Sequence, residues 1–202
     1  MLRLALLLLA LSSPAAFAAN TILVFGDSLS AGHGIRVQQS WPALLDQRLQ
    51  AEKLPYGVAN ASISGETTAG GRTRLPAALA QFKPAVVVIE LGANDGLRGL
   101  PVAQMRANLV AMIAAAQSRG ATVLLVGMKL PPNYGPDYTT QYESAFREAA
   151  QQRKAPFLPF LLEPIAEDSL AFQADGLHPL AAAQPKILDH VWKALRPLLR
   201  QR

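Results

Sequence analysis

The order of hydrophobic and polar positions along this chain alternates between two patterns. Short apolar runs without intervening polar residues are typical of strands that are covered on both faces of a sheet. The clearest run spans residues 85–91, where valine and isoleucine stand side by side. On this basis, strands are predicted at residues 22–25, 56–62, 85–91, 122–127 and 157–160.

Segments with helical spacing lie between these runs. Ser40-Trp41-Pro42 predicts a helix start, with Ser40 as the cap and proline in the first turn, and Thr67 or Thr68 is the predicted cap of the next helix. Strands that alternate with helices indicate a parallel sheet wound on both faces, so we predict a three-layer α/β/α sandwich. The helices are expected to begin at residue 40 and to span residues 67 or 68 to 82, 101–119, 138–153 and 183–199.

Residues 1–18 have the pattern of a secretory signal peptide. Arg3 supplies a positive charge, residues 4–11 form an unbroken apolar run, and Ala16-Phe17-Ala18 fits the small-x-small cleavage pattern. A membrane anchor is the alternative, but the run is short for a spanning helix. We therefore expect a signal peptide at 1–18, one domain at 19–202, and a periplasmic or secreted location.

The composition limits the chemistry. The chain contains no cysteine, which excludes disulfides, thiol nucleophiles and thiolate metal sites. The net charge of +5 favours anionic partners. No nucleic-acid partner is expected, because the basic residues are scattered and few aromatic residues lie near them.

Polar residues follow the first three predicted strands, at Ser28, Gly65 and Asn94. The carboxyl ends of parallel strands meet at one edge of a sheet, where open α/β folds bind their ligands. Asp175 and His178 lie three residues apart in a later loop. A serine hydroxyl becomes a nucleophile when an imidazole accepts its proton and a carboxylate orients that imidazole. These residue types predict acyl-transfer chemistry with Ser28, His178 and Asp175 as the catalytic residues.

A tetrahedral intermediate also needs hydrogen-bond donors for its oxyanion. The backbone N–H groups of Ser28 and Gly65 and the side-chain amide of Asn94 are the candidates. Taken singly, each motif is also consistent with an ordinary turn or helix cap. His33 is a rival base, and Asp27 is expected to have a hydrogen-bonding role in the turn.

Four segments carry a resemblance to a known family: residues 25–30 (Phe-Gly-Asp-Ser-Leu-Ser), 60–65, 92–95 (Gly-Ala-Asn-Asp) and 175–179 (Asp-Gly-Leu-His-Pro). Together they resemble the SGNH (GDSL) family of serine hydrolases, whose signature residues are Ser, Gly, Asn and His. The resemblance extends over essentially the whole of residues 19–202. It is closest to the periplasmic subgroup with acyl-CoA thioesterase, lysophospholipase and arylesterase activities.

The resemblance implies a flavodoxin-like parallel sheet, an acyl-serine intermediate, and neither a metal nor an organic cofactor. It implies small-molecule partners, namely acyl esters, thioesters or lysophospholipids, that lie in an acyl groove. Leu97, Leu100, Leu130 and Pro131 are the candidates for lining this groove, and the glycines beside them would allow a lid to move. A monomer is expected, and transient contact with a membrane surface is a hypothesis.

Two other functions stay open at this point. One is an acetyl esterase that acts on polysaccharides. The other, from a different class, is a flavodoxin-like binding module in which residues 26–32 hold a phosphate at a helix N-terminus. The binding module has no use for Asp175 and His178, and no lysine follows its glycine loop.

Overall fold

The computed structural model describes residues 20–199. The predicted signal peptide therefore lies outside the described residues. Within residues 20–199, no helix combines the length and the apolar character needed to cross a membrane.

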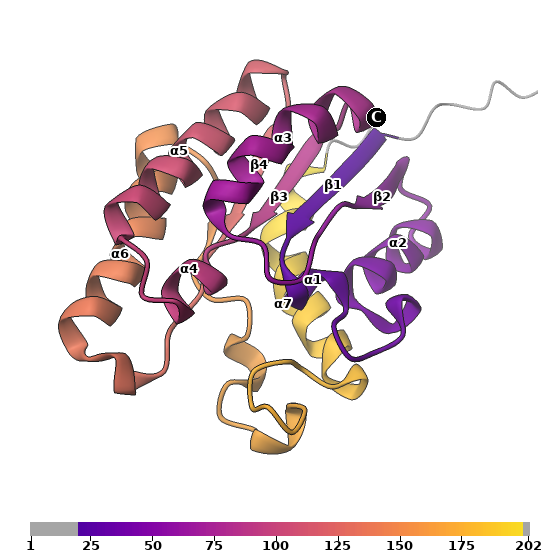
Figure 1. Ribbon diagram of the computed structural model, residues 1–202. Coiled ribbons are helices and arrows are strands. Elements are labelled where there is room, and N and C mark those ends of the chain that lie inside the picture. The colour runs from indigo at the N-terminus through magenta and orange to yellow at the C-terminus, as the bar shows by residue number, and fades with distance from the viewer. Residues whose placement is uncertain (1–19, 200–202) are drawn as a thin grey trace, which may run out of the picture.

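A five-stranded parallel sheet forms the centre of the structure, with the strand order β2-β1-β3-β4-β5 (Figure 1). The two central strands, β1 and β3, are almost completely buried, which explains their unbroken apolar sequences. The predicted fold class is confirmed. The strands are β1 (Asn20–Gly26), β2 (Tyr56–Asn60), β3 (Val86–Glu90), β4 (Thr122–Val126) and β5 (Phe157–Leu158).

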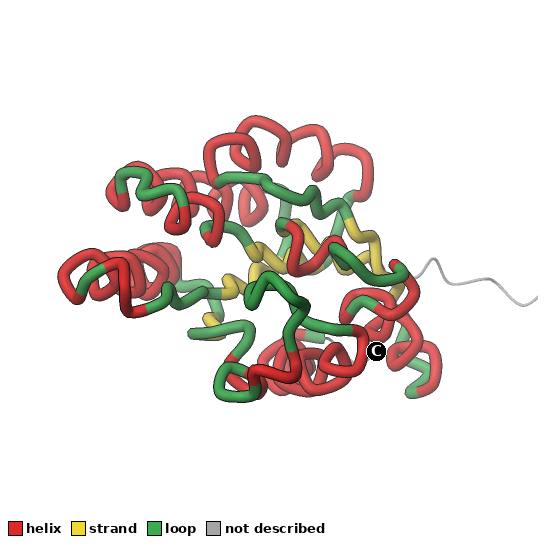
Figure 2. Tube along the Cα trace, turned by 60° about the horizontal axis from the view of Figure 1, so that its bottom comes forward, coloured by secondary structure: helices red, strands yellow, loops and turns green. Residues whose placement is uncertain are grey.

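Helices cover both faces of the sheet (Figure 2). Helices α2 (Trp41–Ala51) and α7 (Gln184–Leu195) pack together on one face. The other face is covered by α3 (Thr68–Phe82), α5 (Val102–Ser118) and α6 (Pro136–Arg153). The sequence pattern does not predict two short helices, α1 (Ser28–Ala31) and α4 (Ala93–Leu97), because four or five residues are too few to show a helical period.

All five strands end at the same edge of the sheet, the lower edge in Figure 1. We call this the carboxyl edge. It consists of the connections that leave the carboxyl ends of the strands, at residues 27–40, 61–67, 91–101, 127–135 and 159–183. Ser28, Gly65, Asn94 and His178 each lie in a different one of these connections, so the parallel topology alone brings them to one edge.

The predicted side-chain cap is present at α3 and absent at α2. Thr67 caps α3 as predicted, because its side chain accepts a hydrogen bond from the Gly70 N–H. Ser40 stands at the cap position of α2, but its hydroxyl donates to the carbonyl of Val37. The side-chain oxygen of Gln184, from α7, accepts from the Trp41 N–H at 2.9 Å. A residue 143 positions away thus replaces the predicted local cap.

Glycine is needed at position 26 because the neighbouring strand leaves no room for a side chain. Its position after an apolar run suggests a sharp turn, but the backbone does not turn there. Its φ lies outside the left-handed region, and it is the last residue of β1. A Cβ at this position would come within 2.5 Å of the Glu90 side chain and 2.9 Å of the Glu90 carbonyl. The neighbouring strand, β3, therefore excludes any side chain here.

Substitution of Gly26 by alanine should lower the free energy of unfolding by about 1–3 kcal/mol, the usual cost of overpacking a core. Gly57 in β2 is the matched control, because its Cβ would meet only one atom, at 3.9 Å. Urea denaturation of both variants measures the difference. Equal stability of Gly26→Ala and Gly57→Ala would contradict this account.

Candidate active site

Ser28 is the first residue of α1 and is separated from the end of β1 only by Asp27, the cap of this helix. Its hydroxyl oxygen lies 2.8 Å from Nε2 of His178, which belongs to the connection between β5 and α7. The two residues are 150 positions apart in the sequence. The structure thus brings together the serine and the histidine that the motifs single out.

Asp175 completes a chain of three side chains. Its Oδ2 lies 2.7 Å from Nδ1 of His178, and its Oδ1 accepts from the backbone N–H groups of Leu177 and His178. The hydrogen bonds from the backbone and ring of His178 hold the pKa of Asp175 well below its usual range. An ionised carboxylate only accepts hydrogen bonds, so Nδ1 bears the proton and the free lone pair of Nε2 faces the Ser28 hydroxyl.

Two backbone N–H groups are available for an oxyanion. Among residues 20–199, no acceptor is found for the N–H of Ser28 or of Gly65. Gly65 has a φ of +80°, which favours glycine, whereas the nearest atom to its Cβ position is 3.7 Å away. Backbone conformation thus explains glycine at this position. Arg98 holds this loop through a 3.0 Å hydrogen bond to the Gly65 carbonyl.

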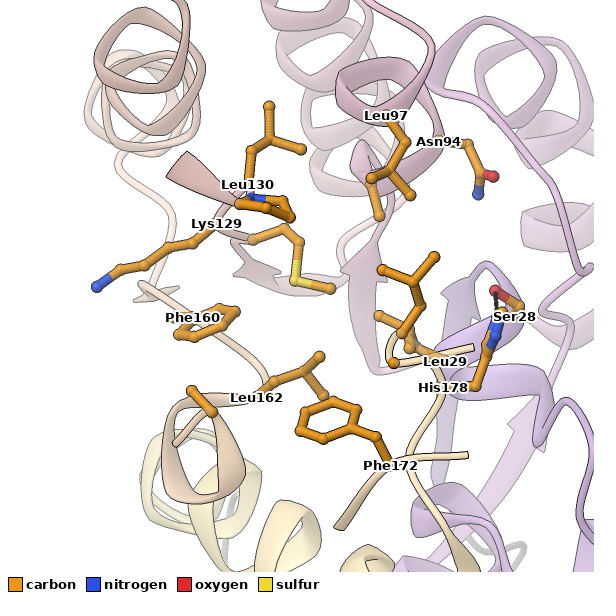
Figure 3. Close-up of a pocket in the computed structure, with 16 residues that line it drawn as sticks. Ser28, Leu29, Asn94, Leu97, Lys129, Leu130, Phe160, Leu162, Phe172 and His178 are labelled. Carbon is orange, nitrogen blue, oxygen red and sulfur yellow. Dashed lines mark hydrogen bonds between the residues drawn. The ribbon is translucent and has the colours of Figure 1, made fainter. Parts of the chain in front are cut away.

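The amide of Asn94 already has two acceptors within the protein. Its Nδ2 lies 3.1 Å from Oδ2 of Asp27 and 3.1 Å from the carbonyl oxygen of Glu66. An amide nitrogen has two N–H bonds, so an oxyanion would have to replace one of these acceptors. Asn94 points toward the Ser28 end of the pocket in Figure 3.

Two carboxyl groups are buried directly beneath the nucleophile. Asp27 accepts from the Leu29 N–H and from Asn94, as its expected structural role requires. Glu90 accepts from the Ser30 hydroxyl at 2.6 Å. Burial raises the pKa of Asp27 to about 6, and burial together with the nearby Asp27 raises the pKa of Glu90 well above its usual range.

A mainly apolar pocket of about 510 Å³ extends from the nucleophile. Ser28 and His178 lie at one end, and Phe160 and Lys129 lie at the other (Figure 3). The Lys129 ammonium is 5.4 Å from the centre of the Phe160 ring. The volume lies within the range of small-ligand pockets, and the lining is suited to an acyl chain.

Three of the four predicted groove residues line this pocket. Leu97, Leu130 and Pro131 do so, whereas Leu100 does not and is partly exposed to solvent. Leu100 lies beyond the end of α4, where the hydroxyl of Tyr138 binds its carbonyl at 3.1 Å. Several other lining residues are not predicted by the sequence, because their positions depend on how the long loops fold: Met128, Lys129, Phe160, Leu162 and Phe172.

The predicted lid segment has several hydrogen bonds to its neighbours. The Tyr134 hydroxyl donates to the Leu97 carbonyl at 3.0 Å, in addition to the contact of Tyr138 with Leu100. A side chain at Gly96 would come within 2.6 Å of Tyr142 and 2.8 Å of Leu130. These contacts would have to break or shift if residues 96–100 moved as a lid. Mobility of the segment stays a prediction.

The ring of His33, the predicted rival base, packs against the ring of His178, and no hydrogen bond between it and the Ser28 hydroxyl is found among residues 20–199. The centres of the two imidazole rings are 4.4 Å apart. The His178 nitrogen, by contrast, lies within hydrogen-bond distance of Ser28. Within residues 20–199, no group of three or more His, Cys, Asp or Glu side chains is arranged to hold a metal ion.

A Ser–His–Asp chain of hydrogen bonds at the carboxyl edge of a parallel sheet is the arrangement of a serine hydrolase. Comparison with known proteins agrees with this class. Residues 24–184 match the model of the GDSL-like lipase/acylhydrolase family, and the chain belongs to this family.

Similar proteins include an esterase, TesA, from Pseudomonas aeruginosa, which is 53% identical over 182 residues and 90% of each chain. Thioesterase 1/protease 1/lysophospholipase L1 from Escherichia coli is 41% identical, over 91% of this chain and 87% of its own. A crystal structure of the psychrotrophic esterase EstA from Pseudoalteromonas, inhibited by monoethylphosphonate, has a TM-score of 0.86. It is 42% identical and covers 90% of this chain and 100% of its own.

The buried Asp27 predicts a loss of stability as the pH rises. The folded protein holds this proton up to about pH 6, whereas an ordinary aspartate has a pKa of 3.8, so the carboxyl lowers stability progressively between these values. Replacement of Asp27 by asparagine removes the ionisation. The stability of the variant relative to wild type should therefore rise by up to about 3 kcal/mol from pH 4 to pH 7.

Urea denaturation of both proteins across this pH range measures the difference. The pKa of about 6 already includes the effect of the Asn94 hydrogen bond on Asp27, and in the asparagine variant that bond does not vary with pH. A constant difference between the two proteins would show that burial does not raise the pKa of Asp27.

Proposed function

We propose that this protein hydrolyses carboxylic esters and thioesters of fatty-acyl groups through an acyl-serine intermediate. The observation that carries the proposal is the hydrogen-bonded chain from Ser28 through His178 to Asp175, with contacts of 2.8 and 2.7 Å. The names of its relatives, an esterase and a thioesterase/lysophospholipase, support this range of substrates.

The reaction has two stages. Ser28 Oγ attacks the acyl carbonyl carbon while His178 Nε2 accepts the hydroxyl proton and Asp175 stabilises the imidazolium. The tetrahedral intermediate collapses, the bond to the leaving group breaks, and His178 returns the proton to the leaving oxygen or sulfur. Water then attacks the acyl-serine with the same histidine as base, which releases the fatty acid and restores Ser28.

Three donors stabilise the oxyanion in this proposal: the N–H groups of Ser28 and Gly65 and the amide of Asn94. An oxyanion is a stronger acceptor than a neutral carbonyl. It would therefore take the Asn94 N–H that is now directed at the Glu66 carbonyl, and Asp27 would keep the other.

The pocket supports longer acyl groups over the other two candidate functions. An acetyl group would leave most of the apolar pocket, with Phe160 at its far end, without a contact. A phosphate-binding module would use the N-terminus of α1, but this helix has only four residues and its first side chain is bound to His178.

The catalytic assignment predicts distinct effects of two substitutions. Ser28→Ala should abolish both hydrolysis of p-nitrophenyl acyl esters and labelling by a fluorophosphonate, because the attacking oxygen is absent. Asn94→Ala should lower kcat by about 100- to 1000-fold, as loss of one oxyanion donor does in other acyl-transfer enzymes. It should still be labelled, although more slowly. Rates on octanoyl and acetyl esters, measured on wild type, test the acyl preference.

Wild-type activity in Ser28→Ala would refute the proposed mechanism. Unchanged kcat in Asn94→Ala would show that its amide serves only Asp27 and Glu66. A preference for acetyl over octanoyl esters would favour the polysaccharide acetyl esterase. Failure of wild type to react with the fluorophosphonate would favour a binding module.

The proposal places the enzyme outside the cytoplasm, with residues 1–18 as a cleaved signal peptide and residues 19–202 as one catalytic domain. The charged start, apolar run and small-x-small site support export. A monomer is proposed, because every predicted catalytic group comes from a single chain.

We also propose that the carboxyl edge makes transient contact with lipid surfaces. Among the described residues, the large hydrophobic side chains that are exposed all lie in connections of this edge. Leu170 is the most exposed, at 86%. One of these side chains, Leu177, also lines the acyl pocket, so this exposed apolar surface adjoins the pocket and is suited to contact with lipid. These residues are Val37, Ile63, Leu100, Leu170, Leu177 and Leu180.

Charge contributes less to this contact than the overall net charge suggests. The exposed charged residues of the carboxyl edge are three cations and four carboxylates. The positive charge of the chain is therefore not concentrated at this edge, and the contact should not require anionic lipids. The cations are Arg36, Arg98 and Lys129, and the carboxylates are Glu163, Glu167, Asp168 and Asp175.

Wild-type protein should sediment with vesicles of zwitterionic phosphatidylcholine, and the double variant Val37→Ser/Leu170→Ser should bind them at least roughly 30-fold more weakly. Each apolar side chain withdrawn from water contributes on the order of 1 kcal/mol or more. Ala80→Ser, on the exposed side of α3, is the control. Hydrolysis of soluble short-chain esters should not change. Binding that is equal in all three proteins, or present only with anionic vesicles, would contradict this surface.

A further inference from the structure

The loop that bears His178 is held by very little regular structure. It belongs to the long connection between β5 and α7, and its local pairing consists of an isolated bridge between Phe172 and Pro179. The Gln173 N–H donates to the His178 carbonyl at 2.8 Å, which closes the same turn. These contacts shape the loop, but they do not connect it to the nucleophile.

His33 lies in the connection that bears Ser28, and its ring faces the ring of His178. Its backbone N–H donates to the Ser28 carbonyl at 3.1 Å, which fixes the main chain at His33 against α1. The His33 and His178 rings are 4.4 Å apart at an angle of 41°. Both nitrogens of His178 are used by Ser28 and Asp175, so His33 contacts the ring without competing for them.

Gln173 joins the two loops directly. Its side-chain nitrogen donates to the His33 carbonyl at 2.8 Å and to the Pro179 carbonyl at 3.2 Å. Gly34 leaves room for this side chain, because a Cβ there would come within 2.0 Å of the Gln173 side-chain oxygen. The Gln173 side chain thus connects the loop that bears Ser28 to Pro179, the residue after His178.

We propose that His33 and Gln173 are positioning residues that hold the His178 imidazole within hydrogen-bond distance of Ser28. His33 does so by ring packing, and Gln173 does so by joining the two loops. Neither touches the reacting atoms. The inference rests on the proposed function for its effect on rate, because a misplacement of about 1 Å in a catalytic group can cost about 100-fold.

The proposal separates turnover from substrate binding. In His33→Ala, kcat for p-nitrophenyl butyrate and the rate of fluorophosphonate labelling should both fall about tenfold or more, while KM stays within about twofold. His33→Phe keeps an aromatic ring in place and should recover most of both rates. Gln173→Ala should resemble His33→Ala, and the double variant should lose less than the product of the two effects, because both act on one contact.

Two controls distinguish positioning from general destabilisation. Gln39→Ala truncates a side chain of the same loop that bonds to Arg36 and should have wild-type kinetics. Thermal unfolding of each variant should show that the folded state is retained at the assay temperature. If His33→Ala does not fold, the recovery of rate in His33→Phe relative to His33→Leu decides whether an aromatic ring is needed.

The ring of His178 can also be followed without any reaction. Its NMR signal, assigned by its loss in His178→Ala, should be a single sharp resonance in wild type and broadened or multiple in His33→Ala. Wild-type kcat and an unchanged His178 signal in His33→Ala would overturn the positioning role. A change confined to KM would also overturn it. An inactive wild type would refute the proposed function, and the NMR comparison would still test this inference.

Discussion

The hydrogen bond between Ser28 and His178 joins the end of a buried strand to a long, irregular loop. Ser28 follows a strand whose residues from Ile22 onward are buried, and Asp27 caps the short helix that begins at the serine. His178 lies in a connection of 25 residues, 159–183, in which regular structure is limited to short 3-10 helices and one bridge. The parallel sheet places the two loops at one edge, but contacts between side chains must set the distance between the Ser28 hydroxyl and the His178 ring.

The segments around Ser28 include two buried carboxyl groups that are unfavourable for stability. A buried carboxylate loses its hydration, so Asp27 and Glu90 lower the stability of the folded protein whenever they ionise. Each has a geometric role in return. Glu90 binds the Ser30 hydroxyl and thereby connects α1 to β3, while Asp27 binds the first turn of α1 and Asn94. Together they fix the residues on either side of Ser28.

The sequence predicts the sheet and helices well because their signals are local. Continuous apolar runs such as residues 85–91 predict buried strands, and the three signature loops follow from where those runs end. Predictions that depend on contacts between distant segments were less successful. Ser40 gave the right helix start but the wrong cap, since Gln184 comes from the other end of the chain.

The same limit applies to the acyl pocket. Leu97 follows a glycine next to the third signature segment and Leu130 precedes two prolines in the loop after β4, so their positions could be predicted. Phe160 and Phe172 line the pocket only because residues 159–183 fold back over the carboxyl edge, and that path has no hydrophobic period. His33 shows this most clearly, because the sequence identifies a titratable ring near the nucleophile and only the structure shows which ring it meets.

In the proposed mechanism, Asn94 is an oxyanion donor that is oriented before the reaction begins. Its two acceptors differ in kind, because Asp27 ionises whereas the Glu66 carbonyl is always neutral. A charged acceptor holds an N–H about twice as strongly as a neutral one. A developing oxyanion therefore competes with Glu66 and not with Asp27, so the amide can turn one N–H toward the substrate while the other stays anchored. The charge of Asp27 thus fixes one N–H of the donor, and the weaker bond to Glu66 leaves the other free to act.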